Sequence, residues 1–372
     1  MAVFRKFKQP DYALLGVIGL LLAAGLLILA SVSAPFSYQK FDNTYYFLKH
    51  QITHGLLPGL ILGFLAFKIN LSLIKKWSPL FLLGNLILMA LVFVPHIGLE
   101  IDGASRWISL GPISLQPSET LKVAFFLYLA AWLANRTPGE KTPKEKKLNQ
   151  TFLVFSAIVG FIAVALISQP DVSTFGLICF VALIMYFANN TPIWHSLSMI
   201  ALGFGALAFL VKLAPYRMNR VTVFFNPEAD PMGIGYQLKQ SLIAIGSGGA
   251  TGAGFGLGVQ KLGLLPQPIA DSIFAVFSEE TGFVGSLFLL SLFLLFLWRG
   301  FKIAKEAENR FEQLLALGIT SWITLQAFIN IGAMMGLFPL TGIPLPFVSY
   351  GGTALITVLV GAGLLLNISQ KT

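Results

Sequence analysis

Long apolar runs alternate with short polar segments along almost the whole chain. Ten of these runs approach the roughly 20 residues that a helix needs to cross a bilayer. They cover residues 12–34, 50–68, 78–96, 117–135, 151–168, 172–189, 193–213, 272–298, 311–336 and 347–368. Helices satisfy their own backbone hydrogen bonds in lipid, whereas membrane strands of about 10 residues would alternate in polarity. The pattern therefore predicts an all-α integral membrane protein with ten transmembrane helices.

Composition agrees with this fold class. The chain has 372 residues, of which 56% are hydrophobic and 11% charged, whereas soluble domains carry about 25% charged residues. The first run is longer than the apolar core of a signal peptide, about 7–15 residues, so we expect it to be retained as a helix. We treat residues 1–372 as a single membrane domain.

The distribution of Lys and Arg predicts the orientation. With the N-terminus in the cytoplasm, ten spans return the C-terminus there. Sixteen Lys and Arg residues, from Arg5 to Lys371, then lie on the cytoplasmic side, against Lys40, Lys49 and Arg106 in the short outer loops. This is the positive-inside bias, and it accounts for most of the net charge of +9 without a nucleic-acid partner.

Two outer segments are long enough to carry function. Loop 97–116 is moderately long, and one large extracytoplasmic loop covers about 214–271. The large loop contains the glycine-rich stretch Gly246–Gly258, whose backbone N–H groups are able to approach anionic oxygens closely. A flexible hinge is the alternative interpretation of these glycines.

Asp271 is the strongest catalytic candidate. It lies where the large loop meets an apolar run, and an ionisable group at a membrane is costly and therefore a functional candidate. If the helix includes Asp271, the small residues Ala275, Ser278 and Gly282 share its face and leave room beside the carboxylate. Nearby cations suggest an anionic substrate, and the candidates to bind it are Arg106, Lys122, Arg217, Arg220 and Lys261.

Several of these candidates also have a purely structural interpretation. Glu119 and Lys122, three residues apart on one helix, would form a bundle-locking ion pair or direct the ammonium towards a phosphate. Arg106, next to a Trp, would anchor at the interface or bind a pyrophosphate. Asp171, at the start of a helix, is favoured as an N-cap, with a role at the substrate as the alternative.

Thiol-based or histidine-based metal binding is not predicted. Cys179 is the only cysteine, and His50, His54, His96 and His195 lack the spacing of metal ligands.

Five segments together resemble the SEDS family, named for shape, elongation, division and sporulation. They are GASRWISLGPISLQPSETLK (103–122), QPD (169–171), NPEADPMGIGYQLKQSLIAIGSGG (226–249), LPQPIADSIFAVFSEETGFVG (265–285) and NIGAMMGLFPLTGIPLPFVSYGG (330–352). The resemblance extends over essentially the whole chain. The 103–122 segment leans towards the FtsW division branch over the RodA branch.

The resemblance implies a peptidoglycan glycosyltransferase that polymerises lipid II, and so extends an undecaprenyl-pyrophosphate-linked glycan, at the outer face of the bacterial cytoplasmic membrane. It also implies a class B penicillin-binding protein, a transpeptidase, as partner. The family aspartate matched by Asp271 is the catalytic one. Family members often carry Glu-x-His-Thr before it, where this chain has Gln267, Pro268, Ile269 and Ala270.

On this hypothesis Asp271 is a general base that takes the proton of the acceptor sugar's 4-hydroxyl, and the cations stabilise the pyrophosphate leaving group. A divalent cation, Mg²⁺ or Mn²⁺, is an open alternative source of that charge, held by Asp171 or Asp271. Two other functions also stay open. They are a lipid II flippase, which places its site near the bilayer midplane, and a non-catalytic division scaffold.

Overall fold

The computed structural model describes residues 9–101, 104–110, 113–136, 144–189 and 191–370. The helices before the first strand are α1 (Tyr12–Phe41), α2 (Tyr46–Gln51), the π-helix η1 (Ile52–Leu56), α3 (Leu57–Lys68) and α4 (Leu71–Leu91). Three strands follow, β1 (Gly98–Ile101), β2 (Ala104–Leu110) and β3 (Ile113–Leu115). The remaining elements are α5 (Pro117–Ala134), α6 (Lys144–Ser168), α7 (Val172–Ala188), α8 (Ile193–Leu213), α9 (Pro215–Phe225), the 3-10 helix η2 (Pro227–Ala229), α10 (Ile234–Ser247), the 3-10 helix η3 (Gln260–Leu262), α11 (Ile273–Glu306), α12 (Arg310–Met334) and α13 (Gly352–Ser369).

The structure confirms a helical, multi-pass membrane architecture. A helix coincides with each of the ten predicted spans, and the second span is built from α2, η1 and α3. Within the described residues, seven of these helical segments are long and apolar enough to cross a membrane: α1, α2–α3, α4, α6, α11, α12 and α13. Helix α7 and the first part of α8 are apolar but shorter. The total of ten crossings therefore stays a prediction.

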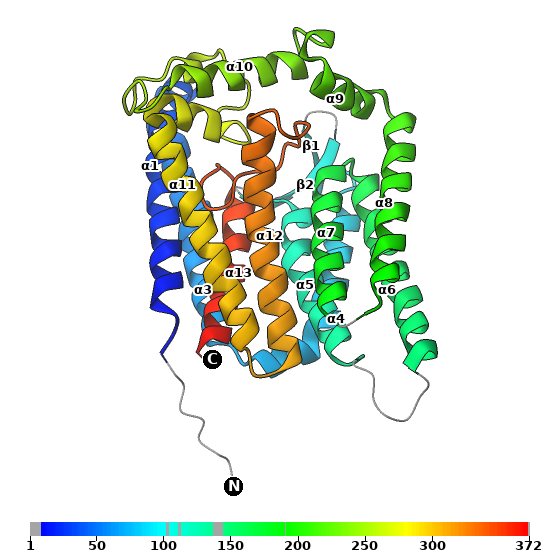
Figure 1. Cartoon of the computed structure of the whole chain (residues 1–372). Helices are drawn as coiled ribbons and strands as arrows, with labels where there is room; N and C mark the ends of the chain where they lie inside the picture. Colours follow the sequence, from blue (N-terminus) through cyan, green and yellow to red (C-terminus); the bar gives the residue numbers. More distant parts are fainter. Residues whose placement is uncertain (1–8, 102–103, 111–112, 137–143, 190, 371–372) are drawn as a thin grey trace.

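The two ends of the helix bundle differ. The start of α1 and the end of α13 meet at one end, where the Asp11 N–H donates to Ser369 Oγ over 3.1 Å and Arg299 of α11 forms an ion pair with Asp11. Figure 1 shows α9 and α10 lying across the opposite end. We call residues 214–272 the cover, and the end of the bundle beneath it the cover end. Of the cations assigned to the cytoplasm, Arg5, Lys6, Lys8, Lys141 and Lys371 lie outside the described residues.

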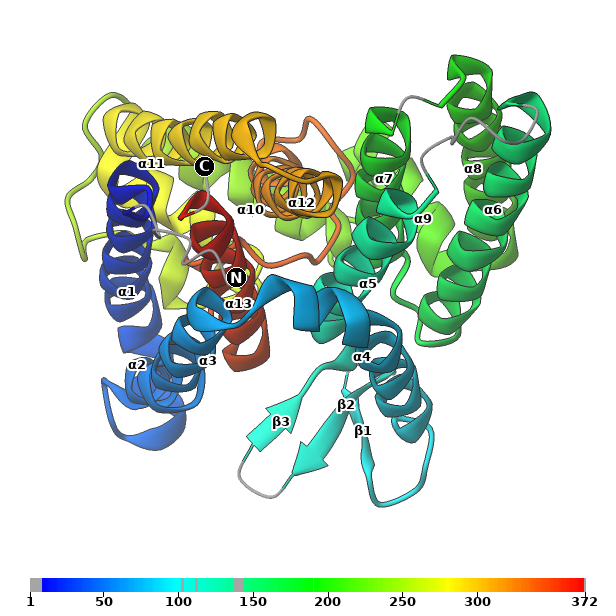
Figure 2. The same ribbon diagram turned by 90° about the horizontal axis from the view of Figure 1, so that it is seen from below.

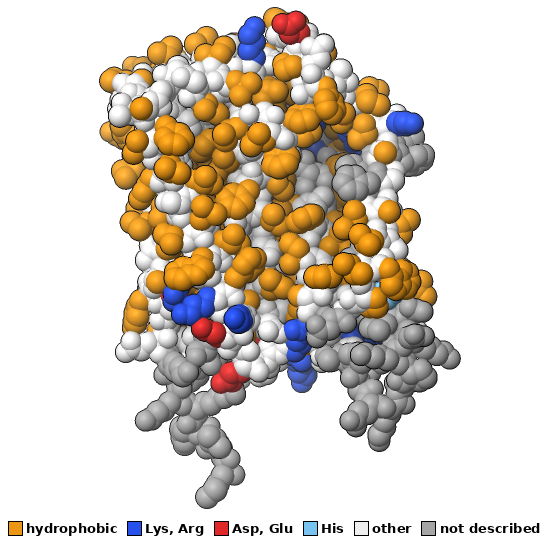
Figure 3. Space-filling model, viewed as in Figure 1, with side chains coloured by type: hydrophobic (Ala, Val, Ile, Leu, Met, Phe, Trp, Pro, Cys, Tyr) orange, Lys and Arg blue, Asp and Glu red, His pale blue; other side chains and the backbone are white. Residues whose placement is uncertain are grey.

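Apolar side chains cover the middle of the bundle. In Figure 3, Lys, Arg, Asp and Glu gather near the end that holds the termini and near the cover, and the band between them is hydrophobic. Many large apolar side chains in this band are exposed, among them Leu20, Leu27, Leu287 and Leu294. Such a belt is expected of a surface that faces lipid rather than water.

The segment expected to be loop 97–116 instead forms a small antiparallel sheet in the order β1-β2-β3. Trp107 lies opposite Leu99, and Ser109 opposite Ser114. Strand β2 carries Trp107 and Ile108 at its centre, residue types that are enriched in strands. Gly103 and Gly111, which we counted as part of the loop, lie outside the described residues.

Helix α3 packs closely on α13. Gly55, Gly59 and Gly63 recur every fourth residue along the second span. A Cβ at Gly63 would lie only 2.8 Å from the Leu359 carbonyl oxygen, and one at Gly55 3.3 Å from the Gly352 Cα. Small residues at this spacing let two membrane helices approach closely. Helix α4 packs on α5 instead, so α3 and α4 diverge, as Figure 2 shows.

Candidate functional site

Asp271 lies in a turn just before α11, at the cover end. The N–H groups of Ala270 and Ser272 both donate to the Gln267 carbonyl, and Gln267 has a left-handed φ of 51°. The side chain of Asp271 is half-buried. Non-glycine residues adopt left-handed backbone at a cost of about 1–3 kcal/mol, and such residues concentrate at functional sites.

The prediction that Asp271 shares a helix face with Ala275, Ser278 and Gly282 is wrong. Helix α11 begins at Ile273, after the carboxylate, and Gly282 interrupts it with φ 64° and ψ −160°. Ala275, Ser278 and Gly282 are buried rather than lining open space. The open side is at Gly342 of the α12–α13 connection, where a Cβ would lie 3.9 Å from Asp271 Oδ2.

The connection between α12 and α13, residues 335–351, supports the turn that carries Asp271. Asn330 of α12 donates to the Asp271 carbonyl over 2.9 Å and to the Ile343 carbonyl over 2.8 Å. The Ser349 hydroxyl donates to the Ala270 carbonyl over 2.5 Å, and the Tyr350 N–H to the Ile269 carbonyl over 2.9 Å. The backbone on both sides of the carboxylate is therefore fixed by α12 and by this connection.

The second span reaches the same connection. The Tyr350 hydroxyl lies 2.9 Å from His50 Nδ1. Gln51 accepts from the Gly351 N–H over 3.0 Å and donates to the Ser349 carbonyl over 3.4 Å. A π-helix begins directly after Gln51, and π-helical turns are frequent at functional sites. The start of the second span thus helps to hold the turn at Asp271.

Arg220 brings positive charge to Asp271. Its Nη1 donates to the Leu340 and Thr341 carbonyls over 3.0 and 3.2 Å, so α9 is tied to the α12–α13 connection. Its Nε is buried without a hydrogen-bond partner among the described residues. Burial lowers the pKa of Arg220, and the carboxylates of Asp271 and Asp171 oppose this effect. A guanidinium nevertheless stays charged in proteins, so the site holds a fixed cation whose Nε donor is unused.

Asp171 and Arg106 complete a charged cluster around Arg220. Asp171 caps α7 by accepting from the Thr174 N–H over 3.2 Å, as its N-cap interpretation predicts. Its Oδ2 is buried and has no hydrogen-bond partner in the described part of the chain. Arg106 of β2 donates to the Gln169 and Pro170 carbonyls over 2.9 and 2.8 Å, directly before Asp171. Arg106, Asp171 and Asp271 all act electrostatically on Arg220.

The electrostatic balance at Asp271 favours a base. Burial raises the pKa of the Asp271 carboxyl above its ordinary value, while a hydrogen bond from Gln237 and attraction to Arg220 oppose the rise. Gln237 of α10 also donates to Ser272 Oγ over 3.0 Å. A carboxylate whose pKa is moved towards the operating pH is a better proton acceptor.

Lys122 lies away from this cluster. Its Nζ is 2.8 Å from both carboxylate oxygens of Glu119 and 2.9 Å from Gln326 Oε1, and the ammonium is fully buried. Gln326 accepts a second hydrogen bond from Trp322 and donates to the Pro344 carbonyl. The Glu119–Lys122 ion pair therefore supports the α12–α13 connection from within the bundle, through Gln326 and the Pro344 carbonyl.

Lys261 also forms a buried ion pair. Its Nζ lies 2.6 Å from Glu280 and donates to the Gly256 carbonyl over 2.9 Å and to Ser31 of α1. Arg217 is half-buried, and its Nε donates to the Tyr216 hydroxyl over 2.8 Å. The structure thus groups the predicted substrate-binding residues Arg106 and Asp171, together with Asp271, around Arg220, and it places the others in separate contacts.

The glycine-rich stretch fills the interruption in α11. The N–H groups of Ala253 and Gly254 donate to the Glu279 and Glu280 carbonyls, and the Phe283 and Val284 N–H groups donate to the Gly249 and Ala250 carbonyls. Gly252 and Gly282 both have positive φ where the two segments meet. These glycines permit close backbone packing. The contacts favour neither the expected binding of anionic oxygens by the backbone N–H groups nor a flexible hinge.

Some site residues were missed by the sequence reasoning. Gln237, Asn330 and Gly342 carry no charge, and their places beside Asp271 depend on contacts between distant segments. The available signal was their position inside the segments that carry the family resemblance.

The described residues hold no group of three or more His, Cys, Asp or Glu side chains placed to bind a metal. Asp171 and Asp271 share their surroundings with two arginines, whose charge opposes a bound cation. The donor set therefore fits a metal poorly, and we derive no step through one.

Comparison with known proteins decides the family. The pattern of the FtsW/RodA/SpoVE family of cell cycle proteins matches residues 12–372. The chain belongs to this family. This FtsW/RodA/SpoVE protein is 37% identical over 365 residues to stage V sporulation protein E of Bacillus subtilis, covering 98% of each.

This FtsW/RodA/SpoVE protein is also 38% identical over 374 residues to the probable peptidoglycan glycosyltransferase FtsW of Nitrosococcus halophilus. The match covers 100% of this chain and 95% of that one. Among solved structures it is similar to a chain of a peptidoglycan synthase complex whose structure concerns the coordination of polymerization and crosslinking. That match has a TM-score of 0.77, 29% identity and 97% coverage of both chains.

Proposed function

We propose that this FtsW/RodA/SpoVE protein is a peptidoglycan glycosyltransferase that polymerises lipid II, with Asp271 as its general base. The observation that carries the proposal is the half-buried Asp271 carboxylate, held by its backbone next to Arg220, which Asp171 and Arg106 also influence. Relatives named as peptidoglycan glycosyltransferases support the reaction class.

In the proposed step, Asp271 takes the proton from the acceptor sugar's 4-hydroxyl as that oxygen attacks the donor's anomeric carbon. The bond between the anomeric carbon and the donor's pyrophosphate breaks, and the lipid pyrophosphate leaves. Arg220, with its unused Nε donor, stabilises the charge that develops on the leaving oxygen. Gly342 leaves the space beside Oδ2 that an approaching hydroxyl needs.

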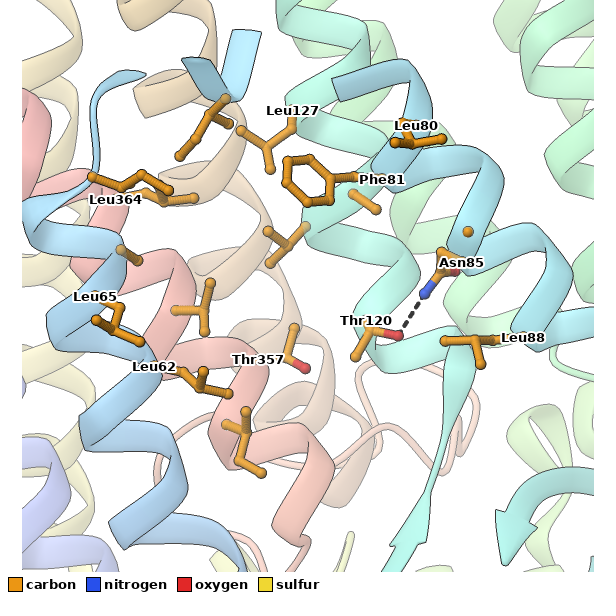
Figure 4. A pocket seen from close by; sticks show the side chains of 18 of the residues that line it. Leu62, Leu65, Leu80, Phe81, Asn85, Leu88, Thr120, Leu127, Thr357 and Leu364 are labelled. Atoms are coloured by element: carbon orange, nitrogen blue, oxygen red, sulfur yellow. Dashed lines mark hydrogen bonds between the residues drawn. The ribbon is translucent and has the colours of Figure 1, made fainter. Parts of the chain in front are cut away.

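An apolar cavity supports a lipid-linked substrate. It has a volume of about 780 Å³ and lies between α3, α4, α5 and α13. Figure 4 shows leucines such as Leu62, Leu65, Leu88 and Leu127 around it, with the Asn85–Thr120 hydrogen bond at one side. Such a cavity suits an isoprenoid chain, because burying each CH₂ group is favourable by about 0.8 kcal/mol.

The proposal includes the setting of the reaction. The cover end would face the outside of the bacterial cytoplasmic membrane, with both termini in the cytoplasm, as the distribution of Lys and Arg favours. A class B penicillin-binding protein would be the transpeptidase partner. Similarity to a chain of a complex that coordinates polymerization with crosslinking supports such a partner.

The test is glycan synthesis from purified lipid II in detergent, with and without the transpeptidase. Because general base catalysis contributes roughly 10²–10⁴-fold, Asp271→Asn should lower the rate by about that factor and leave folding intact. Glu228→Gln, an exposed carboxylate of the same cover, is the matched control and should polymerise at the wild-type rate.

Normal synthesis by well-folded Asp271→Asn protein would refute the base assignment. If the wild-type protein made no glycan even with its partner, a flippase or a scaffold would be favoured instead, since neither forms glycosidic bonds.

A further inference from the structure

The segment Phe255–Leu264, between the glycine-rich stretch and the turn at Asp271, lies at the outer edge of the molecule. Its 3-10 helix η3 contacts both α1 and α11. In Figure 2 the yellow-green chain that follows α10 runs along the flank of the bundle beside these two helices. The position of the segment is therefore lateral, whereas α9 and α10 lie across the end of the bundle.

The side chains of this segment are arranged with apolar groups outward. Its exposed residues are Phe255 at 55%, Leu257 at 69%, Val259 at 54%, Leu262 at 63% and Leu264 at 43%. Lys261 is the only charged residue between positions 255 and 264, and it is 5% exposed because it forms the ion pair with Glu280. A loop in water would present the charge and bury the leucines.

Part of the segment's backbone is hydrogen-bonded within the protein, through the N–H groups of Leu257, Val259, Gln260 and Leu262. The Val259 and Gln260 N–H groups donate to the buried Glu279 carboxylate, and Lys261 Nζ donates to the Gly256 carbonyl. Further N–H groups donate inside the segment, from Leu257 to Gly254, from Leu262 to Val259 and from Leu265 to Gln260. In water such groups need no internal partner, but in hydrocarbon each unpaired one costs several kcal/mol.

The depth of the segment follows from its contacts with α1. A hollow of about 450 Å³ is lined by Phe255–Val259 and by Ser31, Ala34 and Pro35 of α1. Helix α1 continues to Phe41, so at 1.5 Å per residue its end lies roughly 9 Å beyond Pro35 along the axis. Tyr38 and Lys40, residues typical of the membrane interface, occupy that last stretch. The segment is therefore below the level of the interface.

We propose that Phe255–Leu264 is immersed in the acyl chains of the leaflet on the cover side and anchors the cover to the bilayer. The sequence predicts one large extracytoplasmic loop over about 214–271, and the proposal places part of it within the bilayer. It is independent of the glycosyltransferase proposal, because it concerns only where the segment lies. The continuous belt of exposed apolar side chains on α1 and α11 extends onto the segment and argues for lipid as its occupant.

Spin labelling in lipid nanodiscs tests the depth directly. Cys179, the only cysteine, is first replaced by Ala, and single cysteines are then introduced as Leu257→Cys or Leu262→Cys and labelled with a nitroxide. Met232→Cys, 90% exposed in the cover, is the aqueous control, and Leu294→Cys, exposed on α11, is the control within the bilayer. Collision rates with oxygen, which partitions into lipid, are compared with those of a water-soluble nickel chelate.

We expect the ratio of oxygen to nickel collisions at positions 257 and 262 to be several-fold higher than at 232 and to approach that at 294. Ratios equal to that at 232 would overturn the proposal, because they would place the segment in water. The measurement is repeated with the transpeptidase bound. Loss of oxygen access at both positions would also overturn it, because a protein surface rather than lipid would then cover the segment.

Discussion

Replacing Lys122 with Met tests whether this buried ammonium holds the bundle together or contacts the substrate. The substitution keeps the length of the side chain and removes its charge. Glu119 would keep its charge in a buried site, where Lys122, 2.8 Å from both carboxylate oxygens, is its one ion-pair partner among the described residues. Gln326 would keep its hydrogen bond from Trp322, so its Oε1 would not be orphaned.

The expected magnitude follows from these contacts. Removing one partner of a buried ion pair costs about 3–5 kcal/mol, because the remaining charge has no compensation. Replacing both partners with apolar residues is often neutral or stabilising. We therefore expect Lys122→Met to lower the free energy of unfolding by about 3–5 kcal/mol, and the added change Glu119→Leu to restore most of that loss.

The assay combines unfolding of the purified protein in detergent with glycan synthesis at a temperature where all variants are folded. If Lys122 is structural, the single variant unfolds early but still makes glycan at that temperature, and the double variant recovers the lost stability. The reasoning would be refuted by a single variant that unfolds like the wild type but makes no glycan. That outcome would assign Lys122 to the substrate.

Three further changes give distinct outcomes. Because attraction to Arg220 lowers the raised pKa of Asp271, Arg220→Gln should raise it further and shift the acidic limb of the kcat/KM profile to higher pH; an unshifted limb would contradict this. Gly282→Ala puts a Cβ on a backbone of positive φ and within clashing distance of the Gly252 backbone N, so in detergent unfolding it should cost more than the backbone strain alone, about 1–3 kcal/mol, whereas Gly246→Ala, with open space for a Cβ, should cost little. Tyr350→Phe loses the hydroxyl bond to the second span and should lower stability by about 0.5–1.5 kcal/mol, and wild-type stability would show that this bond is dispensable.

The sequence predicts the helical membrane fold because each apolar run is a local property of the chain. It also predicts the importance of Asp271, since a carboxylate next to an apolar run is conspicuous on composition alone. Asp171 was predictable as a helix cap, because capping depends on residues within one turn.

Which side chains come together at Asp271 was less predictable than the helical fold. Lys261 has its partner Glu280 nineteen positions later, so its neutralisation could not be recognised from local spacing. Asn330 reaches the Asp271 carbonyl only because residues 335–351 fold back beneath the cover. The small-residue stripe failed because Gly282 breaks the helix whose regular period the argument assumed.

The supports of Asp271 have a consequence for biosynthesis. The carbonyls of Ile269 and Ala270 are held by Tyr350 and Ser349, which the ribosome adds long after Asp271 itself. Chains emerge from the N-terminus, and earlier segments fold before later ones exist. A nascent chain that stops short of residue 349 would therefore carry the proposed catalytic carboxylate on a turn that lacks these two hydrogen bonds. The site would be complete only after the last part of the bundle enters the membrane. The end of translation therefore determines when the enzyme can become active.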